Sequence, residues 1–372
     1  MNRCSKPATI GKILFRDYYR KLNPEDVNIS SFSMREFAFS YFEGAGMQRH
    51  VSFYTPADLI EQLRYSVPRH VYHSSAYYAN PSAKDMDSKG WRGADLVFDI
   101  DVDHVETPCK ELHDRWSCKK CGATGWGTCE KCPRCGSESI EREVWICETC
   151  INVARDEVLK LNEFLENDFG ISKNEMIVTF SGHRGFHVHV ESEAVKSLGQ
   201  DGRREIVDYI RGVGLDYRQV LIRVPGGYKL RFDSSSPGWY GRIVRWAMLH
   251  SSSNELVTDL KTWQIIIENC ISSEKAAIDE KVTVDIHRLI RLKNSLHGRT
   301  GLKAATFSIQ ELENQNPLDK VKAFRGEAFI EAKRVPQVML DVNLKENEGK
   351  IPLYAALYLL LNGAEVVNFQ VL

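Results

Sequence analysis

Apolar residues follow two different periods along the chain, and each period predicts one kind of element. Residues 55–66 and 151–170 carry apolar side chains at helical spacing, which predicts two amphipathic helices. Residues 96–98, 176–180 and 186–190 are short runs rich in β-branched and aromatic side chains, which predicts three strands.

Further features of the sequence indicate where one helix begins and where other helices lie. Thr55 is a suitable helix N-cap with Pro56 at the first helical position. The nine apolar residues 353–361 are too few to span a bilayer, so they predict a buried helix. Residues 192–275 are polar and helix-like, which predicts a variable, mostly helical insertion.

Three carboxylates stand at alternate positions directly after the first predicted strand, in DLVFDIDVDH (95–104). Side chains two residues apart on a strand point to the same side, so Asp99 and Asp101 project together, and Asp103 joins them if the strand continues. Like charges this close destabilise a protein unless a cation lies between them. A solvated turn with a nearby Lys or Arg, or a metal ion, would supply that charge.

Composition narrows the class of protein. The 372 residues are 43% hydrophobic and 27% charged, as in soluble globular proteins. The N-terminal residues lack the continuous apolar stretch of a signal peptide, so we expect a cytoplasmic protein. The formal net charge is −1, so any nucleic acid must be bound by a local basic patch or with another subunit.

Eight of the ten cysteines fall within residues 109–150, and in a cytosolic chain such clustering indicates metal binding. CKKCG (118–122) and CPRCG (132–136) are paired Cys-x2-Cys-Gly knuckles, so we expect an inner zinc site, although Cys129 allows a shifted pairing. We expect a second, outer zinc site whose ligands flank the inner ones in the sequence. For each of the two sites, the alternative is a set of reduced cysteines without metal. The inner ligands would be Cys118, Cys121, Cys132 and Cys135, and the outer ligands Cys109, His113, Cys147 and Cys150.

Two further segments suit anionic ligands. In SGHRGFHVHV (181–190), Ser181, Arg184 and His187 surround a tight turn and could bind phosphate, although a plain polar hairpin is the alternative. In residues 278–301, two carboxylates, Asp279 and Asp285, precede a basic cluster, as a metal–triphosphate site requires. The alternative is a solvated basic helix end. The cluster consists of Arg288, Arg291, Lys293, His297 and Arg299.

Carboxylates together with phosphate-binding turns favour two chemistries, nucleotidyl transfer or metal-dependent phosphodiester hydrolysis. At this point the chain resembles the catalytic small subunit of the archaeal-eukaryotic primases, and SLHG in place of the eukaryotic SVHP is similar to the archaeal form. The matching segments occur in family order across residues 35–301. They are REFAF, the arginine of MQRHVSF, GWRGADLVFDID, ICETC with the helix after it, SGHRGFH and RLIRLKNSLHGRTG.

The resemblance assigns roles to particular residues. The acidic pair of the family falls on Asp99 and Asp101, and its third metal-binding aspartate, eighteen residues before His297, falls on Asp279, with Asp285 as the rival. Asp103 is not a core ligand in the family and is expected at a solvated strand end. The implied nucleotide-binding residues are Arg49, Ser181, Arg184, His187, Arg291 and His297, and Arg299 is a further candidate.

Two details of the sequence depart from or extend the family pattern. His183 replaces the first arginine of the family's Ser-Gly-Arg-Arg-Gly motif, which leaves the role of that position open. The family's zinc motif matches the outer cysteine–histidine group, whereas the inner knuckles are not part of the common pattern and are expected to be structural.

The resemblance implies a mixed α/β (α+β) primase–polymerase fold: one catalytic domain over 1–372, with a zinc-binding region at 105–150 and the helical insertion at 192–275. It implies Mg²⁺ or Mn²⁺ for catalysis, Zn²⁺ for structure, a single-stranded DNA template, nucleoside triphosphates and a large-subunit partner. It also implies a role in DNA replication at the nucleoid. Two alternatives remain: a stand-alone primase–polymerase of repair or plasmid type, and a non-enzymatic zinc-ribbon protein that binds nucleic acid.

Overall fold

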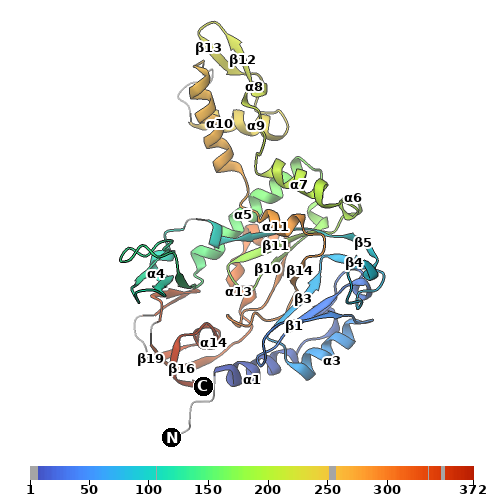
Figure 1. Ribbon diagram of the computed structural model, residues 1–372, viewed down its shortest axis with the longest axis vertical. Helices are drawn as coiled ribbons and strands as arrows, with labels where there is room; N and C mark the ends of the chain where they lie inside the picture. Colours follow the sequence, from blue (N-terminus) through green and yellow to red (C-terminus); the bar gives the residue numbers. More distant parts are fainter. Residues whose placement is uncertain (1–6, 106, 251–256, 334, 345–347) are drawn as a thin grey trace.

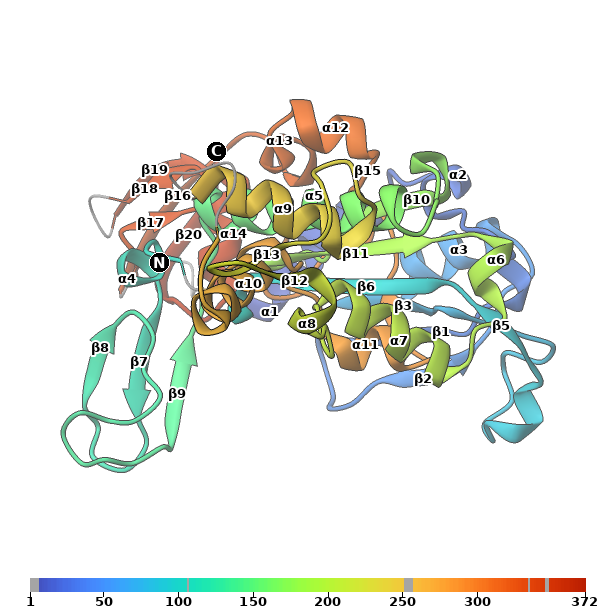
Figure 2. The ribbon, with the colours of Figure 1, turned by 90° about the horizontal axis from the view of Figure 1, so that it is seen from above.

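The computed structural model describes residues 7–105, 107–250, 257–333, 335–344 and 348–372. It has a mixed α/β body, with one arm of helices that extends away from it and a small β-ribbon that projects from its side (Figures 1 and 2).

Two four-stranded sheets form the centre of the body. The first has the order β14-β3-β1-β2, and its strands are Leu289–Arg291, His70–Ser74, Phe37–Ser40 and Gln48–Val51. The second has the order β15-β10-β11-β6, and its strands are Thr306–Phe307, Met176–Phe180, Gly185–Val190 and Leu96–Asp101. The three strands predicted from apolar runs therefore lie side by side in the second sheet.

The second sheet has one apolar face and one mixed face. Leu96, Phe98 and Ile100 of β6 are fully buried in the main core, where helix α5 (Glu148–Asn167) covers them. The alternate residues Val97, Asp99 and Asp101 face the other way. Val97 packs there against Val282 and Ile290, so α11 and β14 cover this second face.

The helix predicted to begin after Thr55 begins there in the structure. Helix α3 (Pro56–Ser66) starts after Thr55, whose hydroxyl accepts the amide hydrogen of Asp58 at 3.3 Å. The Asp58 carboxylate in turn accepts the amide hydrogen of Thr55 at 2.9 Å, which completes a capping box.

The helices within residues 193–274 are α6 (Glu193–Lys196), α7 (Gln200–Ile210), α8 (Tyr217–Val220), α9 (Gly238–His250) and α10 (Leu260–Glu274), and the hairpin there is β12 (Leu221–Val224) with β13 (Gly227–Leu230). Of these, α6 and α7 lie against the body, and the elements from α8 to α10 form the arm (top of Figure 1). The outer part of the arm has a small core of its own, which includes Ile243, Trp263 and Ile267.

The cysteine-rich region starts with α4 (Lys110–His113) and continues as a three-stranded sheet. Its strands are β7 (Arg115–Cys118), β8 (Thr124–Trp126) and β9 (Ile140–Glu143), and they project from the body (left of Figure 2).

The predicted buried helix at 353–361 is α14 (Leu353–Leu361), which packs beside a sheet of β19 (Glu348–Pro352), β16 (Glu327–Lys333) and β20 (Glu365–Val371). Over the described residues, no helix has the length and apolar character needed to cross a membrane. The other helices are α1 (Pro7–Tyr19), α2 (Pro24–Val27), α11 (Glu280–Val284), α12 (Ile309–Asn314) and α13 (Pro317–Val321). The other strands are β4 (Ala76–Tyr78), β5 (Trp91–Ala94), β17 (Val338–Met339) and β18 (Val342–Asn343).

A buried ion pair joins the first sheet to β6. Arg35, two residues before β1, lies 2.7 Å from the carboxylate of Asp95, the residue before β6, and both side chains are almost fully buried. The same guanidinium donates to the carbonyl oxygens of Ser74 and Ser75 and stacks 3.9 Å above the ring of Tyr77.

We expect Asp95→Ala to lower the free energy of unfolding by about 3–5 kcal/mol, because it leaves a buried guanidinium without its counter-charge. Urea unfolding measures this change. The control is Asp17→Ala, whose pair with Arg20 is exposed and 3.8 Å long and should contribute at most about 0.5 kcal/mol. Equal effects of the two substitutions would contradict the expectation.

Candidate active site and metal groups

Three carboxylates come from two elements that meet at β6. Asp99 and Asp101 lie on the mixed face of this strand. Asp279 is the N-cap of α11, and its amide hydrogen bonds to the carbonyl oxygen of Asp99 at 2.9 Å. The rival Asp285 lies at the opposite end of α11, where its carboxylate accepts the amide hydrogen of His287. The geometry therefore favours Asp279 over Asp285.

The environment of Asp101 suits a bound cation. Burial, together with the nearby charges of Asp103 and Asp99, raises the pKa of Asp101 to about 6. Among the residues that the structure describes, no Lys or Arg forms an ion pair with Asp101. A divalent ion between these carboxylates would supply the missing positive charge.

A buried cation lies on the same side of the molecule. Arg291, at the end of β14, is only 6% exposed, and its guanidinium contacts the ring nitrogen of His70 at 3.2 Å and the hydroxyl of Tyr72 at 3.3 Å. Burial lowers the pKa of Arg291, and no described carboxylate pairs with this guanidinium. A buried charge without a counter-ion is costly, so this position suits an anionic ligand.

The turn at 181–185 packs directly on this cation. Gly182 has a φ of +85°, and a Cβ atom there would lie 2.5 Å from Cβ of His297 and 3.5 Å from Cδ of Arg291. The hydroxyl of Thr300 donates to the carbonyl oxygen of Gly182 at 2.6 Å. The hydroxyl oxygen of Ser181 accepts amide hydrogens within the turn. The turn at 181–185 and the segment 291–300, more than 100 residues apart in the chain, thus pack together as one group of polar residues.

His187 connects the carboxylates to the cations. On β11 it lies opposite Asp99 of β6, and its Nε2 is 3.5 Å from the Asp99 carboxylate. Burial, together with the positive charges of Arg291 and Arg288, lowers the pKa of His187 to about 3. His297 likewise has a pKa well below the usual value, first because of burial and then because of Arg291. Both imidazoles are therefore neutral and can donate hydrogen bonds without added charge.

Two predicted nucleotide-binding arginines have protein partners instead. Arg49 on β2 donates from Nε to the buried carboxylate of Glu36 at 3.0 Å. Arg184 is 1% exposed at its side chain and contacts Asp103 at 2.8 Å, the carboxylate of Asp114 and the carbonyl oxygen of Trp145. Direct contact of Arg184 with a nucleotide stays a prediction, because in this structure protein groups surround its guanidinium.

Asp103 lies just past the strand end and is exposed, as expected, but it also has a protein partner. Strand β6 ends at Asp101, and Asp103 lies in the following 3₁₀ turn, Val102–His104. Its side chain is 44% exposed, yet it forms the ion pair with Arg184. The third alternate carboxylate is therefore paired with a protein cation.

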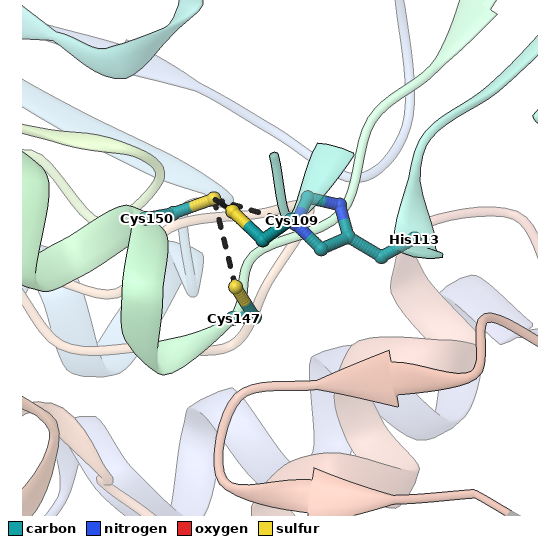
Figure 3. A group of neighbouring side chains, drawn as sticks. All are labelled: Cys109, His113, Cys147 and Cys150. Carbon is teal, nitrogen blue, oxygen red and sulfur yellow. Dashed lines mark hydrogen bonds between the residues drawn. The ribbon is translucent and has the colours of Figure 1, made fainter. Parts of the chain in front are cut away.

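The outer metal group is assembled as the spacing suggests (Figure 3). Its four ligand atoms lie within 4.8 Å of one another, and all four side chains are buried. The Sγ atoms of Cys109 and Cys147 lie 3.6 and 3.8 Å from Sγ of Cys150, and Nε2 of His113 lies 3.4 Å from it. Tetrahedral zinc with Zn–S bonds of about 2.3 Å places sulfurs about 3.8 Å apart, so these residues fit the ion.

The inner group is also assembled, in the projecting β-ribbon. Its four sulfurs lie within 4.8 Å of one another, and the 118–135 and 121–132 pairs are 3.6 and 3.5 Å apart. Gly122 and Gly136, with φ of +70° and +68°, form the tight turns of the two knuckles. Cys129 contacts the carbonyl oxygen of Lys131 instead, so the geometry does not favour the shifted pairing. The group consists of Cys118, Cys121, Cys132 and Cys135.

Several residues of the site could not be found in the sequence. His70 and Tyr72 on β3 hold Arg291, and Thr300 holds the 181–185 turn. Asp114 contacts both His113 and Arg184. Only the position of Asp114 directly after a predicted ligand offered a signal, because a ligating histidine commonly donates its second N–H to a carboxylate.

Alternate carboxylates on β6 and a buried arginine on β14 are groups of the kind that a metal-dependent nucleotide site uses, and comparison with known proteins specifies the family. Residues 137–309 match the family described as DNA primase small subunit. The DNA primase small subunit PriS of Methanothrix thermoacetophila is 33% identical over 97% of this chain and 99% of its own.

Other relatives agree with this assignment. The PriS protein of Pyrobaculum islandicum is 34% identical over 94% of this chain and 96% of its own, and that of Saccharolobus islandicus is 35% identical over 97% and 96%. The chain belongs to the DNA primase small subunit family. Among solved structures, the polymerase domain of Mycobacterium tuberculosis Ligase D in complex with DNA aligns with 84% of this chain and 90% of its own, at 11% identity and a TM-score of 0.38.

The two metal groups should differ in their effect on stability. Cys147 lies in the main core, whereas Cys121 packs only in the small cluster of the ribbon. We expect Cys147→Ser to remove one bound metal ion per chain and to lower the main melting temperature, because metal binding there contributes to folding of the body. Cys121→Ser, the matched control, should also remove one ion but leave the main transition in place. Mass spectrometry of bound metal and calorimetric melting test both, and an equal loss of melting temperature would contradict the distinction.

Proposed function

We propose that the protein is the catalytic subunit of a DNA primase, a DNA-directed nucleotidyltransferase that synthesises short primers on single-stranded DNA during replication. Membership of the primase small subunit family supports this role. The observation that carries the chemistry is the contact of His187 with Asp99 at 3.5 Å, together with the nearby charge of Arg291, which lowers the pKa of His187.

Asp99, Asp101 and Asp279 are proposed to hold two divalent ions, Mg²⁺ or Mn²⁺. These ions would activate the 3′-hydroxyl of the primer and neutralise the leaving pyrophosphate. Two features of the backbone support this proposal: Asp99 and Asp101 alternate on β6, and the backbone of Asp279 at the start of α11 hydrogen-bonds to that of Asp99. The high pKa of Asp101 is consistent with a carboxylate that ionises fully when a cation binds.

The incoming nucleoside triphosphate is proposed to bind with its phosphates against the second half of the site. Arg291 supplies a full charge, while His187, His297 and the hydroxyl of Ser181 supply hydrogen bonds to phosphate oxygens. The neutral state of both imidazoles is useful here, because the ring N–H groups donate while the total charge stays low. Direct roles for Arg49 and Arg184 remain predictions.

Both cysteine-containing groups are proposed to hold structural Zn²⁺. Each group offers four protein ligands and so leaves no open position for a substrate.

A large-subunit partner is also part of the proposal. The net charge of −1 leaves this chain without a strong field of its own for a DNA template, so a second subunit would share the template. The complex would act in the cytoplasm, at the replicating nucleoid. Copurification with a large subunit separates this assignment from a stand-alone primase–polymerase. A zinc-ribbon binding protein would have no use for the carboxylates and the buried arginine.

We expect Asp101→Asn and Asp279→Asn each to reduce primer synthesis below about one-hundredth of the wild-type rate, a loss typical of removing one group from a preorganised polar site. The assay uses unprimed single-stranded DNA with labelled nucleotides of both sugar types. Asp285→Asn is the matched control, because Asp285 lies at the other end of α11 and should leave the rate unchanged. Retained synthesis by Asp101→Asn with the fold intact would remove the assignment.

We expect Arg291→Gln to weaken nucleotide binding about 10- to 100-fold, because a hydrogen bond to a charged group contributes about 1.5–3 kcal/mol. Stability should not fall in parallel, since no described carboxylate loses a partner. Titration calorimetry with Mn²⁺ and a nonhydrolysable nucleotide measures the affinity, and thermal melting measures the stability. The exposed Arg325→Gln is the control. An unchanged affinity for Arg291→Gln would contradict the triphosphate site.

A further inference from the structure

We propose that Asp114 and Arg184 are positioning residues that connect the outer metal group to the catalytic carboxylate Asp101. This inference rests on the proposed function, because it assigns the outer group a part in shaping the divalent-ion site. A chain of direct contacts from His113 to Asp101 supports it.

The first contact lies at the outer metal group. His113 directs Nε2 toward the cysteine sulfurs, and its Nδ1 lies 2.8 Å from the carboxylate of Asp114. With Nε2 committed to a metal, Nδ1 must carry the proton and donate it to Asp114. The amide hydrogen of Trp145 bonds to the same carboxylate oxygen at 3.0 Å. Asp114 is therefore held by one residue before the β-ribbon, His113, and by one residue after it, Trp145.

Arg184 forms the central contact. Its Nη2 bonds to the Asp114 carboxylate, its Nε bonds to the Trp145 carbonyl oxygen at 2.8 Å, and its Nη1 bonds to Asp103 at 2.8 Å. The planar guanidinium can reach both carboxylates at once, whereas a lysine ammonium offers only a single point of charge. Burial in a low-dielectric setting makes these contacts directional.

The last contact reaches the carboxylate strand. The amide hydrogen of Asp103 bonds to the carboxylate of Asp101 at 2.8 Å, and the amide hydrogen of Val102 bonds to the carbonyl oxygen of Arg184 at 3.3 Å. Arg184 therefore holds the 3₁₀ turn that orients Asp101. Its ion pair with Asp103 also gives that exposed carboxylate a counter-charge within the protein.

A purely structural ion pair would make a different prediction. It would change the melting temperature and leave the affinity for the catalytic ion as it is. A positioning role instead changes the affinity for the ion while metal in the outer group is retained. A direct role of Arg184 on phosphate would alter nucleotide affinity but not the affinity for Mn²⁺ alone.

The test uses full-length Arg184→Lys and Asp114→Asn, with the exposed Glu141→Gln on β9 as the control. Arg184→Lys preserves net charge, so its effect reports geometry. We expect both variants to bind Mn²⁺ about tenfold more weakly by electron paramagnetic resonance without nucleotide, as for other residues that support metal ligands. Bound zinc should stay at the wild-type level, and saturating Mn²⁺ should restore much of the primer synthesis.

Unchanged Mn²⁺ affinity in Arg184→Lys overturns the inference, whatever Asp114→Asn does. Loss of zinc or early melting in Asp114→Asn, with normal Mn²⁺ binding in Arg184→Lys, shows a structural ion pair only. Failure of the proposed function gives a separate signal, because wild type and Asp101→Asn would then bind Mn²⁺ equally.

Discussion

The antiparallel register between β6 and β11 is the constraint on which the site depends. It places Asp99 opposite His187 and Asp101 opposite Gly185, with Phe98 and Ile100 on the buried face. A shift by one residue would drive both aspartates into the apolar core and is therefore strongly opposed. Gly185 is required at its position, because a Cβ atom there would lie 1.9 Å from the carbonyl oxygen of Ile100. The core thus fixes where the two carboxylates emerge.

Near this pair of strands, charged side chains lack ion-pair partners of opposite charge. Among the described residues, Asp101 has no ion pair with a Lys or Arg, and Arg291 has none with a carboxylate. Asp101 is half-buried near other carboxylates, and Arg291 is buried beside neutral imidazoles. Stability alone would favour pairing such groups or replacing them with apolar residues. Their separation across His187 suits two ligands of opposite charge, a divalent cation and a phosphate. A protein commonly departs from locally favourable pairing at functional sites.

The two metal groups of the cysteine-rich region lie in different parts of the structure. Its inner group lies in a projecting ribbon with a small cluster of its own, whereas its outer group is buried in the main core. Through Asp114 and Arg184, the outer group also contacts the turn that follows β6. This arrangement gives the third alternate carboxylate, Asp103, a protein partner.

The sequence by itself determined the features with a local physical cause: the three central strands, the Thr55 cap, the Cys-x2-Cys-Gly knuckles and the paired Asp99 and Asp101. Strand alternation, capping and metal-ligand spacing all act over a few residues. Family resemblance was needed to choose Asp279. Only the tertiary structure decided the partners of Arg184 and Arg291, because they lie 39 or more residues away in the chain. Contacts between distant segments produce no repeating pattern in the sequence. The sequence therefore shows which residues are charged but not which residues they pair with.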